Sequence, residues 1–232
     1  MLSKKIISEN PALSGEDYHN LKMEIMNLFK DESIVFNWKL SKREWSMRII
    51  SGINKGKKLY APEGAQVRPT GDKIKEAVFN IIGPIDEEAV VLELFAGSGS
   101  VGIEFLARGA KHCTFIDVSR KSLNYVKKNL DLCNFNNKAK IIMSDYEKAI
   151  INLSQNNEKF DYIFADPPYA LNLSNNIINK VFEFDIIKSG GLLIIETDKS
   201  EKVIDNKDTN MIKYKEKIYG RTRISLIRRL EE

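Results

Sequence analysis

The chain has few of the residues that would build a metal site, a disulfide framework or a membrane span. Its 232 residues include two cysteines and two histidines, and neither Cys113 nor Cys133 stands in a CxxC pair. We therefore expect no metal site and two free thiols. No window reaches the ~20 uninterrupted apolar residues of a membrane helix, and the first residues lack the apolar core of a signal peptide. A cytoplasmic protein that does not enter membranes is expected.

A strong excess of one charge sign is also absent, because the formal net charge is only +4. The charges are unevenly distributed, however. Residues 47–83 and 210–232 each carry a net charge of +4, whereas residues 84–209 carry −4 and residues 1–46 carry none. Two basic segments around an acidic middle indicate a surface for a polyanion, although solvated lysines would give the same pattern.

From residue 89 onward, short apolar runs alternate with helical periodicity. Strands are expected at 89–94, 112–117, 139–145, before Asp166 and at 190–197, with helices between them, and the tail reads as two strands joined near Gly220. Strands that alternate with helices predict an α/β fold. We expect a mostly parallel seven-stranded sheet with helices on both faces and a terminal antiparallel hairpin.

The segment before this alternation divides into two parts. Residues 16–30 carry the stripe of an amphipathic helix, and residues 47–62 read as two short strands around an Asn-Lys-Gly turn. A helix follows, DKIKEAVFNII, which Thr70 or Asp72 could cap. We divide the chain into an N-terminal extension, 1–46, and a domain, 47–232, composed of a hairpin and helix (47–83) and a core (84–232). The extension is either a helical appendage or the result of an upstream translation start.

A glycine-rich turn follows the first predicted strand of the core. Gly97, Gly99 and Gly102 satisfy GxGxxG, where glycine lets the backbone turn sharply and approach a ligand. Asp117 ends the next strand, where it could accept hydrogen bonds from a ribose. Asp145 closes the third strand and would either meet an adenine amine or cap the following helix. These features fit binding of NAD and of S-adenosylmethionine equally well.

An Asp-Pro-Pro-Tyr turn at the end of the fourth strand separates these two cofactors. Two prolines make the turn stiff, so the Asp166 carboxylate and the Pro167 carbonyl become fixed acceptors at the edge where ligands of α/β sheets bind. Such acceptors can take both hydrogens of a planar exocyclic amine and aim its lone pair at an electrophilic methyl group, while Tyr169 stacks on the base. A rigid surface turn is the alternative interpretation.

These residues resemble the bacterial class I methyltransferases that modify guanine N2 in 16S ribosomal RNA at the position called 966. The resemblance extends from Met47 to about Arg229, and the motifs that carry it are MRIISGINKGKKLYAP, VRPTGDKIKEAVFNII, LFAGSGSVGIEFLARGA, ADPPY and YGRTRISL. It implies a Rossmann-like fold and S-adenosylmethionine as the cofactor. The residues implied to hold the cofactor are Thr70, Glu93, Phe95, Ala96, Gly97, Ser98, Gly99, Asp117 and Asp145, and those implied to hold the guanine are Asp166, Pro167, Pro168 and Tyr169.

The chain departs from the family pattern at two of these motifs. Glu93 stands where aspartate is usual, which keeps the carboxylate but moves it one methylene further out. Gly71 replaces a second threonine, which alters the cap chemistry of the segment from Thr70 to Asn80 that would close over the cofactor.

The resemblance also implies a partner for the basic segments. The residues expected to contact RNA phosphates are Arg48, Lys55, Lys57, Lys58, Arg68, Arg221 and Arg223, with Lys213, Lys215 and Lys217 beside them. The target guanine must be flipped out or presented in a loop to reach the site. We expect a monomer that acts on 16S ribosomal RNA within an assembling small ribosomal subunit.

Other functions remain open from the residues alone. An adenine-N6 methyltransferase of DNA or RNA, or a protein-glutamine methyltransferase, would need a similar grip on a planar amine or amide. An NAD-dependent oxidoreductase would use the glycine turn but leaves the Asp-Pro-Pro-Tyr turn unexplained, and a non-catalytic RNA-binding assembly protein would use only the basic segments.

Overall fold

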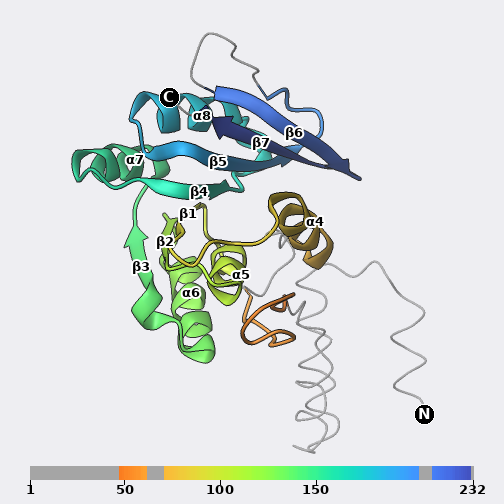
Figure 1. Ribbon diagram of the computed structural model, residues 1–232, viewed down its shortest axis with the longest axis vertical. Helices are drawn as coiled ribbons and strands as arrows, with labels where there is room; N and C mark the ends of the chain where they lie inside the picture. The colour runs from red at the N-terminus through yellow and green to blue at the C-terminus, as the bar shows by residue number, and fades with distance from the viewer. Residues whose placement is uncertain (1–46, 62–70, 204–210, 231–232) are drawn as a thin grey trace, which may run out of the picture. The chain divides into compact units, whose positions relative to one another are not determined.

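The computed structural model describes residues 47–61, 71–203 and 211–230 of the chain. They form one seven-stranded sheet in the order β3-β2-β1-β4-β5-β7-β6 (Figure 1). The bounds of the parallel strands are β1 Val90–Leu94, β2 His112–Asp117, β3 Ala139–Met143, β4 Phe160–Ala165 and β5 Ile187–Asp198. The two antiparallel strands are β6 Met211–Tyr219 and β7 Thr222–Arg229. This confirms the predicted α/β sheet with its terminal hairpin.

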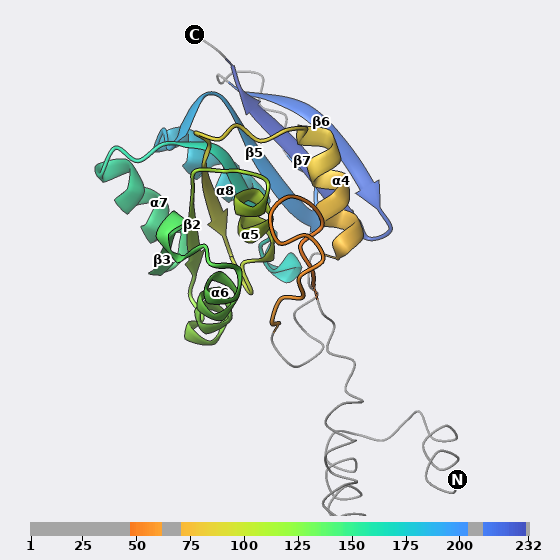
Figure 2. The ribbon, with the colours of Figure 1, turned by 60° about the horizontal axis from the view of Figure 1, so that its bottom comes forward.

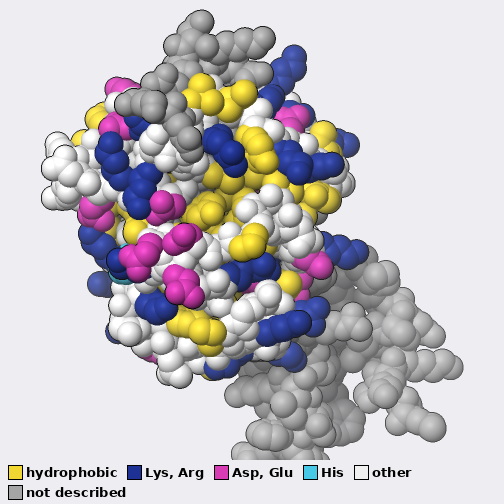
Figure 3. All heavy atoms as spheres, in the orientation of Figure 1, with side chains coloured by type: hydrophobic (Ala, Val, Ile, Leu, Met, Phe, Trp, Pro, Cys, Tyr) yellow, Lys and Arg dark blue, Asp and Glu magenta, His cyan; other side chains and the backbone are white. Residues whose placement is uncertain are grey.

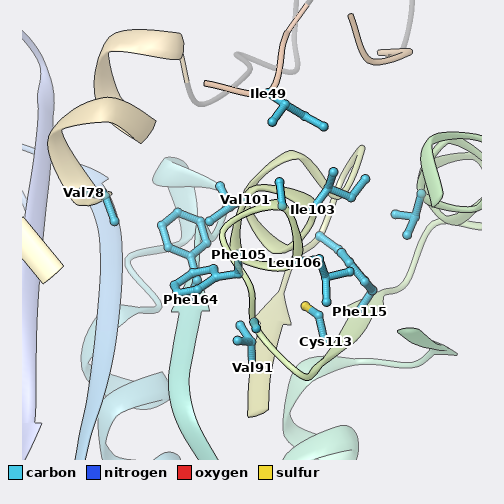
Figure 4. Close-up of a cluster of buried hydrophobic side chains, with 14 of the residues drawn as sticks. Ile49, Val78, Val91, Val101, Ile103, Phe105, Leu106, Cys113, Phe115 and Phe164 are labelled. Atoms are coloured by element: carbon cyan, nitrogen blue, oxygen red, sulfur yellow. The ribbon is translucent and has the colours of Figure 1, made fainter. Parts of the chain in front are cut away.

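Helices cover both faces of the sheet. Helices α4 (Asp72–Ile82), α5 (Ser100–Ala107) and α6 (Arg120–Cys133) pack on one face, and α7 (Tyr146–Gln155) and α8 (Ser174–Glu183) pack on the other. On the first face Phe105 of α5 lies against Phe79 of α4, with ring centroids 4.7 Å apart, and close to Phe164 of β4 (Figure 4). Burial on both faces explains why β1 and β4 are mainly apolar in sequence.

The parallel strands end in register, and this alignment creates the edge of interest. Leu94 pairs with Ile116 of β2 on one side and with Ala165 of β4 on the other, and Ala165 in turn pairs with Ile195 of β5. The segments that follow β1, β2 and β4 therefore leave the sheet side by side.

The segment 47–61 lies against α5 and α6 (Figure 2). Instead of the two predicted strands it forms one antiparallel bridge, between Arg48 and Lys58, because tight turns occupy residues 51–56. Gly52 makes the closest approach to the domain core. Its φ is +75°, and the N–H of Ile53 donates to the carbonyl of Ala107 at 2.7 Å.

Three predicted details are wrong. The strand expected at 139–145 ends at Met143, because Asp145 caps the helix that follows. Asp72 does not cap α4, because the N-cap residue is Gly71, which lacks a side chain, and the Asp72 carboxylate accepts from the Nε of Arg48 at 3.0 Å instead. Strand β5 begins at Ile187 rather than at residue 190, because its first residues pair with Phe160 before a register shift. Thr70, the other predicted cap, and the extension 1–46 lie outside the described residues.

The close approach of Gly52 predicts a large cost for adding one methyl group there. A Cβ at Gly52 would lie 1.9 Å from the Ala107 carbonyl oxygen, whereas a Cβ at Gly56, whose φ is also positive, would meet nothing within 4 Å. Gly56→Ala should cost about 1 kcal/mol for the left-handed backbone alone, and Gly52→Ala at least about 2 kcal/mol more. Urea unfolding of both variants measures the difference, and equal costs would contradict the packing described for residues 47–61.

Candidate active site

The structure brings most of the predicted cofactor and substrate residues to one edge of the sheet. Phe95, Asp117 and Asp166 each follow or end a parallel strand, and Asp145 follows β3 by two residues. Because the strands β3, β2, β1 and β4 are neighbours, these residues lie along the carboxyl edge in that order. This is the edge where open α/β sheets bind their ligands.

The glycine turn adopts the left-handed backbone that its sequence predicts. Gly97 and Gly99 have φ values of +57° and +76°, and Phe95, at +58°, shares this conformation despite its side chain. Gly102 serves packing instead, since a Cβ there would lie 2.5 Å from the ring of Phe115 and 2.6 Å from Cys113. The three glycines thus combine a tight turn with close contact between α5 and β2.

Asp117 holds this turn through its carboxylate. One oxygen accepts the N–H of Gly97 at 2.8 Å, and the other accepts the N–H of Ser119 at 2.7 Å. The carboxylate therefore links the end of β2 to the loop after β1. It remains half-buried at the edge, and contact with a ribose stays a prediction.

Glu93 lies behind the turn and not on its open side. Its side chain is 3% exposed, and its two oxygens accept the N–H groups of Val101 and Gly102 at 3.3 and 3.0 Å. Burial raises the pKa of Glu93 to about 8, while these two hydrogen bonds oppose the rise. Glu93 thus anchors the first turn of α5, and contact with a cofactor amine stays a prediction.

Asp145 occupies the N-cap of α7. Its carboxylate accepts from the N–H of Glu147 at 2.9 Å, so the capping interpretation is confirmed. The next residue, Tyr146, packs on Phe95, with ring centroids 5.2 Å apart. The cap thereby supports the glycine turn from the β3 side, and a further contact of Asp145 with an adenine stays a prediction.

The Asp-Pro-Pro-Tyr turn leaves β4 beside the glycine turn. Asp166 is half-buried, Pro167 is buried and Pro168 is exposed. Tyr169 opens a short 3-10 turn, Tyr169–Leu171, and its hydroxyl donates to Glu196 Oε1 at 3.0 Å. Burial, followed by the negative charge of Glu196, raises the pKa of Tyr169, so the phenol stays protonated at neutral pH.

Two buried side chains that the sequence analysis did not single out tie residues 47–61 to the site. Asn129 of α6 accepts the N–H of Tyr60 at 2.7 Å and donates to the carbonyls of Tyr60 and Ser98, both at 2.9 Å. Glu104 of α5 accepts the N–H groups of Ile50 and Ser51. The sequence gives only a weak signal for these contacts. Asn129 and Glu104 are polar residues that fall on the apolar face of their helices, and nothing local identifies their partners.

Lys75 is a third buried polar residue near the turn. It is fully buried, and its Nζ donates to the carbonyl of Arg48 at 2.7 Å. Burial lowers the pKa of Lys75, and the nearby carboxylates of Glu104 and Asp72 oppose that effect. Helix α4 is thereby bound to the segment 47–61 next to α5.

The predicted RNA-contacting residues differ in what they already bind. Lys55 and Lys58 are exposed, whereas Lys57 donates from Nζ to the carbonyl of Leu132 at the end of α6, 3.0 Å away. Of the arginines, Arg48 pairs with Asp72, Arg221 with Asp198 and Arg223 with Glu216. Lys and Arg side chains lie over several parts of the face in Figure 3, near acidic ones. Arg68 and Thr70 lie outside the described residues.

Three other features bear on the choice of site. A hollow of about 510 Å³ lies at the opposite, amino edge of the sheet, beside Ala89, Asp161 and Leu192, and is therefore remote from both turns. In the ranges 47–61, 71–203 and 211–230, no group of His, Cys, Asp or Glu could hold a metal ion. No helix in those ranges is long and apolar enough to cross a membrane.

Comparisons of the sequence with known proteins identify relatives that align with most of the domain. The model of the family described as conserved hypothetical protein 95 matches residues 47–228. The chain is 34% identical to ribosomal RNA small subunit methyltransferase D of Haemophilus influenzae over 73% of this chain and 88% of that protein. It is 31% identical to the protein of that name from Escherichia coli, over 79% and 90% of the two chains.

Solved structures that resemble this one are also described as methyltransferases. A solved structure described as a putative methylase, HI0767 of Haemophilus influenzae, superposes with a TM-score of 0.66 at 30% identity, over 80% of this chain and 99% of that one. An RNA methyltransferase of Salinibacter ruber, solved with S-adenosylhomocysteine, superposes with a TM-score of 0.55 over 71% and 95% of the chains. At 14% identity, that likeness concerns the class I methyltransferase fold alone.

The raised pKa of Glu93 predicts how stability depends on pH. Between an unfolded pKa near 4.5 and a folded pKa near 8, the folded state binds the extra proton, so its stability falls as pH rises through this window. Compared with Glu93→Gln, which has no charge to bury, the wild-type protein should lose on the order of 4 kcal/mol of unfolding free energy between pH 5 and pH 9. Urea unfolding across this range measures it, and parallel pH profiles would refute the assignment.

Proposed function

Because the chain belongs to the family of the ribosomal RNA small subunit methyltransferase D proteins, we propose that it transfers a methyl group from S-adenosylmethionine to the exocyclic N2 amine of a guanine in 16S ribosomal RNA. The target is the guanine at the position called 966, within an assembling small subunit in the cytoplasm. The observation that carries the proposal is the register of Leu94 with Ala165, since it sets the glycine turn beside the Asp-Pro-Pro-Tyr turn.

The glycine turn fits the methyl donor. At Gly97 the nearest atom to an added Cβ is 4.0 Å away, so the turn presents bare backbone rather than a packed side chain on its outer side. Residues 95–99 would surround the donor, the Asp117 carboxylate would accept from its ribose, and Asp145 would lie near its adenine. S-adenosylmethionine supplies the electrophilic methyl group when it is bound.

The Asp-Pro-Pro-Tyr turn binds and orients the guanine amine that accepts the methyl group. The Asp166 carboxylate and the Pro167 carbonyl accept the two N2 hydrogens, which draws the nitrogen lone pair out of conjugation with the guanine ring. The ring of Tyr169 stacks on the base and holds the amine in line with the methyl group. Methylation makes the amine acidic, so Asp166 takes the proton without having to be a strong base beforehand.

The basic residues of the two sequence ends serve the RNA backbone. Lys55 and Lys58 are exposed on the segment 47–61, which Asn129 binds to the glycine turn. The turn that carries Lys55 binds the C-terminal ends of α5 and α6, so these lysines would contact RNA phosphates at a distance from the flipped guanine. Such contacts orient the RNA without reading its sequence.

Removing the Asp166 carboxylate should abolish transfer without affecting donor binding. Asp166→Ala is expected to lower label transfer from S-adenosylmethionine to unmethylated small subunits by about a thousandfold or more. Asp166→Asn keeps one acceptor oxygen and should retain more activity. Calorimetry should give both variants the wild-type affinity for S-adenosylhomocysteine. An active Asp166→Ala variant would refute the role of this turn.

Removing exposed lysines should weaken RNA binding in a salt-dependent way. The double variant Lys55→Ala, Lys58→Ala should bind RNA more weakly. The slope of log K against log salt concentration should become shallower by roughly 0.7–0.9 for each lost phosphate contact. Lys159→Ala is the matched control, because this exposed lysine lies outside both basic segments, precedes β4 and pairs with Asp185. Lys57→Ala should also lower stability, since its Nζ binds the end of α6. Equal effects of the pair and the control would argue against the surface.

A further inference from the structure

The hydroxyl of Tyr169 is held by two buried side chains from other strands. It donates to Glu196 Oε1 of β5 at 3.0 Å and lies 3.3 Å from Thr222 Oγ1 of β7. Glu196 is 4% exposed and Thr222 is 1% exposed. Both partners are therefore fixed by packing, and the far end of the tyrosine ring is fixed with them.

The sheet register explains why these side chains meet. Ala165 pairs with Ile195, so Asp166 and Glu196 occupy equivalent positions near the carboxyl ends of neighbouring parallel strands. Glu196 pairs with Ile224 of β7, and Thr222 lies two residues before Ile224 on the same face. Three strand ends, β4, β5 and β7, thus converge on one phenol.

This arrangement limits what Tyr169 can do. Its proton is committed to a carboxylate, and burial together with the charge of Glu196 holds its pKa well above the usual range. Acid–base work by the hydroxyl is therefore disfavoured. The ring face is the part that can meet a base, and its orientation depends on the anchored hydroxyl.

We propose that Glu196 and Thr222 are positioning residues that hold the ring of Tyr169 at the angle needed to stack on the target base. The inference rests on the proposed function, because it concerns how that site orients its acceptor. A base that stacks at the wrong angle still binds, but its amine leaves the line of transfer. The anchor should therefore affect the transfer step more than binding.

Two threonines provide a matched pair of variants. Thr222→Val removes the hydroxyl that lies against Tyr169. Thr197→Val removes a hydroxyl that is fully buried on β5 and has no hydrogen-bond partner among the described residues. Thr222→Val should lower the single-turnover rate of methyl transfer about tenfold, with unchanged KM for RNA. Thr222→Ser should restore the rate, and Thr197→Val should leave it unchanged. Equal rate losses in the two valine variants, in proportion to their stability losses, would overturn the proposal.

A double-mutant cycle tests whether the anchor acts through Tyr169. Tyr169→Phe keeps the ring and removes the hydroxyl. If Thr222 acts through that hydroxyl, Thr222→Val should cause no further loss in the Tyr169→Phe background. Independent, multiplicative losses would contradict the proposal. Glu196 is tested in the same way. Glu196→Gln, which keeps an acceptor oxygen, should lower the rate of methyl transfer less than Glu196→Ala does.

One readout does not depend on activity. With 3-fluorotyrosine incorporated at position 169, fluorine NMR follows the ionisation of the phenol, and its pKa should fall in Glu196→Gln because a negative charge is removed. An unchanged titration would overturn the anchor. A wild-type protein that shows this titration yet methylates no small subunit would overturn the proposed function and leave the anchor supported.

Discussion

The register of β1 with its two neighbours is the constraint on which the rest of the site depends. Leu94 lies opposite Ile116 and Ala165, so three strands end at one level. A shift of one residue in either pairing would turn the side chains of that strand to the other face of the sheet. It would also separate the glycine turn from the Asp-Pro-Pro-Tyr turn along the edge.

Around that edge, buried and half-buried polar side chains hold the backbone through hydrogen bonds. Glu93 and Asp117 support the glycine turn from behind and from the side, and Asn129 connects its Ser98 carbonyl to Tyr60. Each buried polar group would be costly without partners, so each both needs and enforces the local geometry. The two turns are therefore held at positions set before any ligand arrives, which is the condition for catalysis by proximity.

The sheet and the two turns could be predicted because their signals are local. Alternating apolar strands and helices specify the layers, and GxGxxG and Asp-Pro-Pro-Tyr specify backbone conformations that few other residues allow. The supports could not be predicted. Glu196 and Thr222 approach Tyr169 only through the pairing of β5 with β7, and Asn129 reaches Tyr60 across 69 residues of sequence. The single bridge between Arg48 and Lys58 was not predicted, because Gly52 packs on α5 and does not extend a strand.

The proposed function gives this site a single chemical product, and identifying that product is its decisive test. Small ribosomal subunits that lack the modification would be incubated with the protein and S-adenosylmethionine, and their RNA digested to nucleosides for mass spectrometry. We expect N2-methylguanosine, from a single position of 16S ribosomal RNA. N6-methyladenosine as the product, or no methylated nucleoside from a protein that binds S-adenosylhomocysteine, would contradict it.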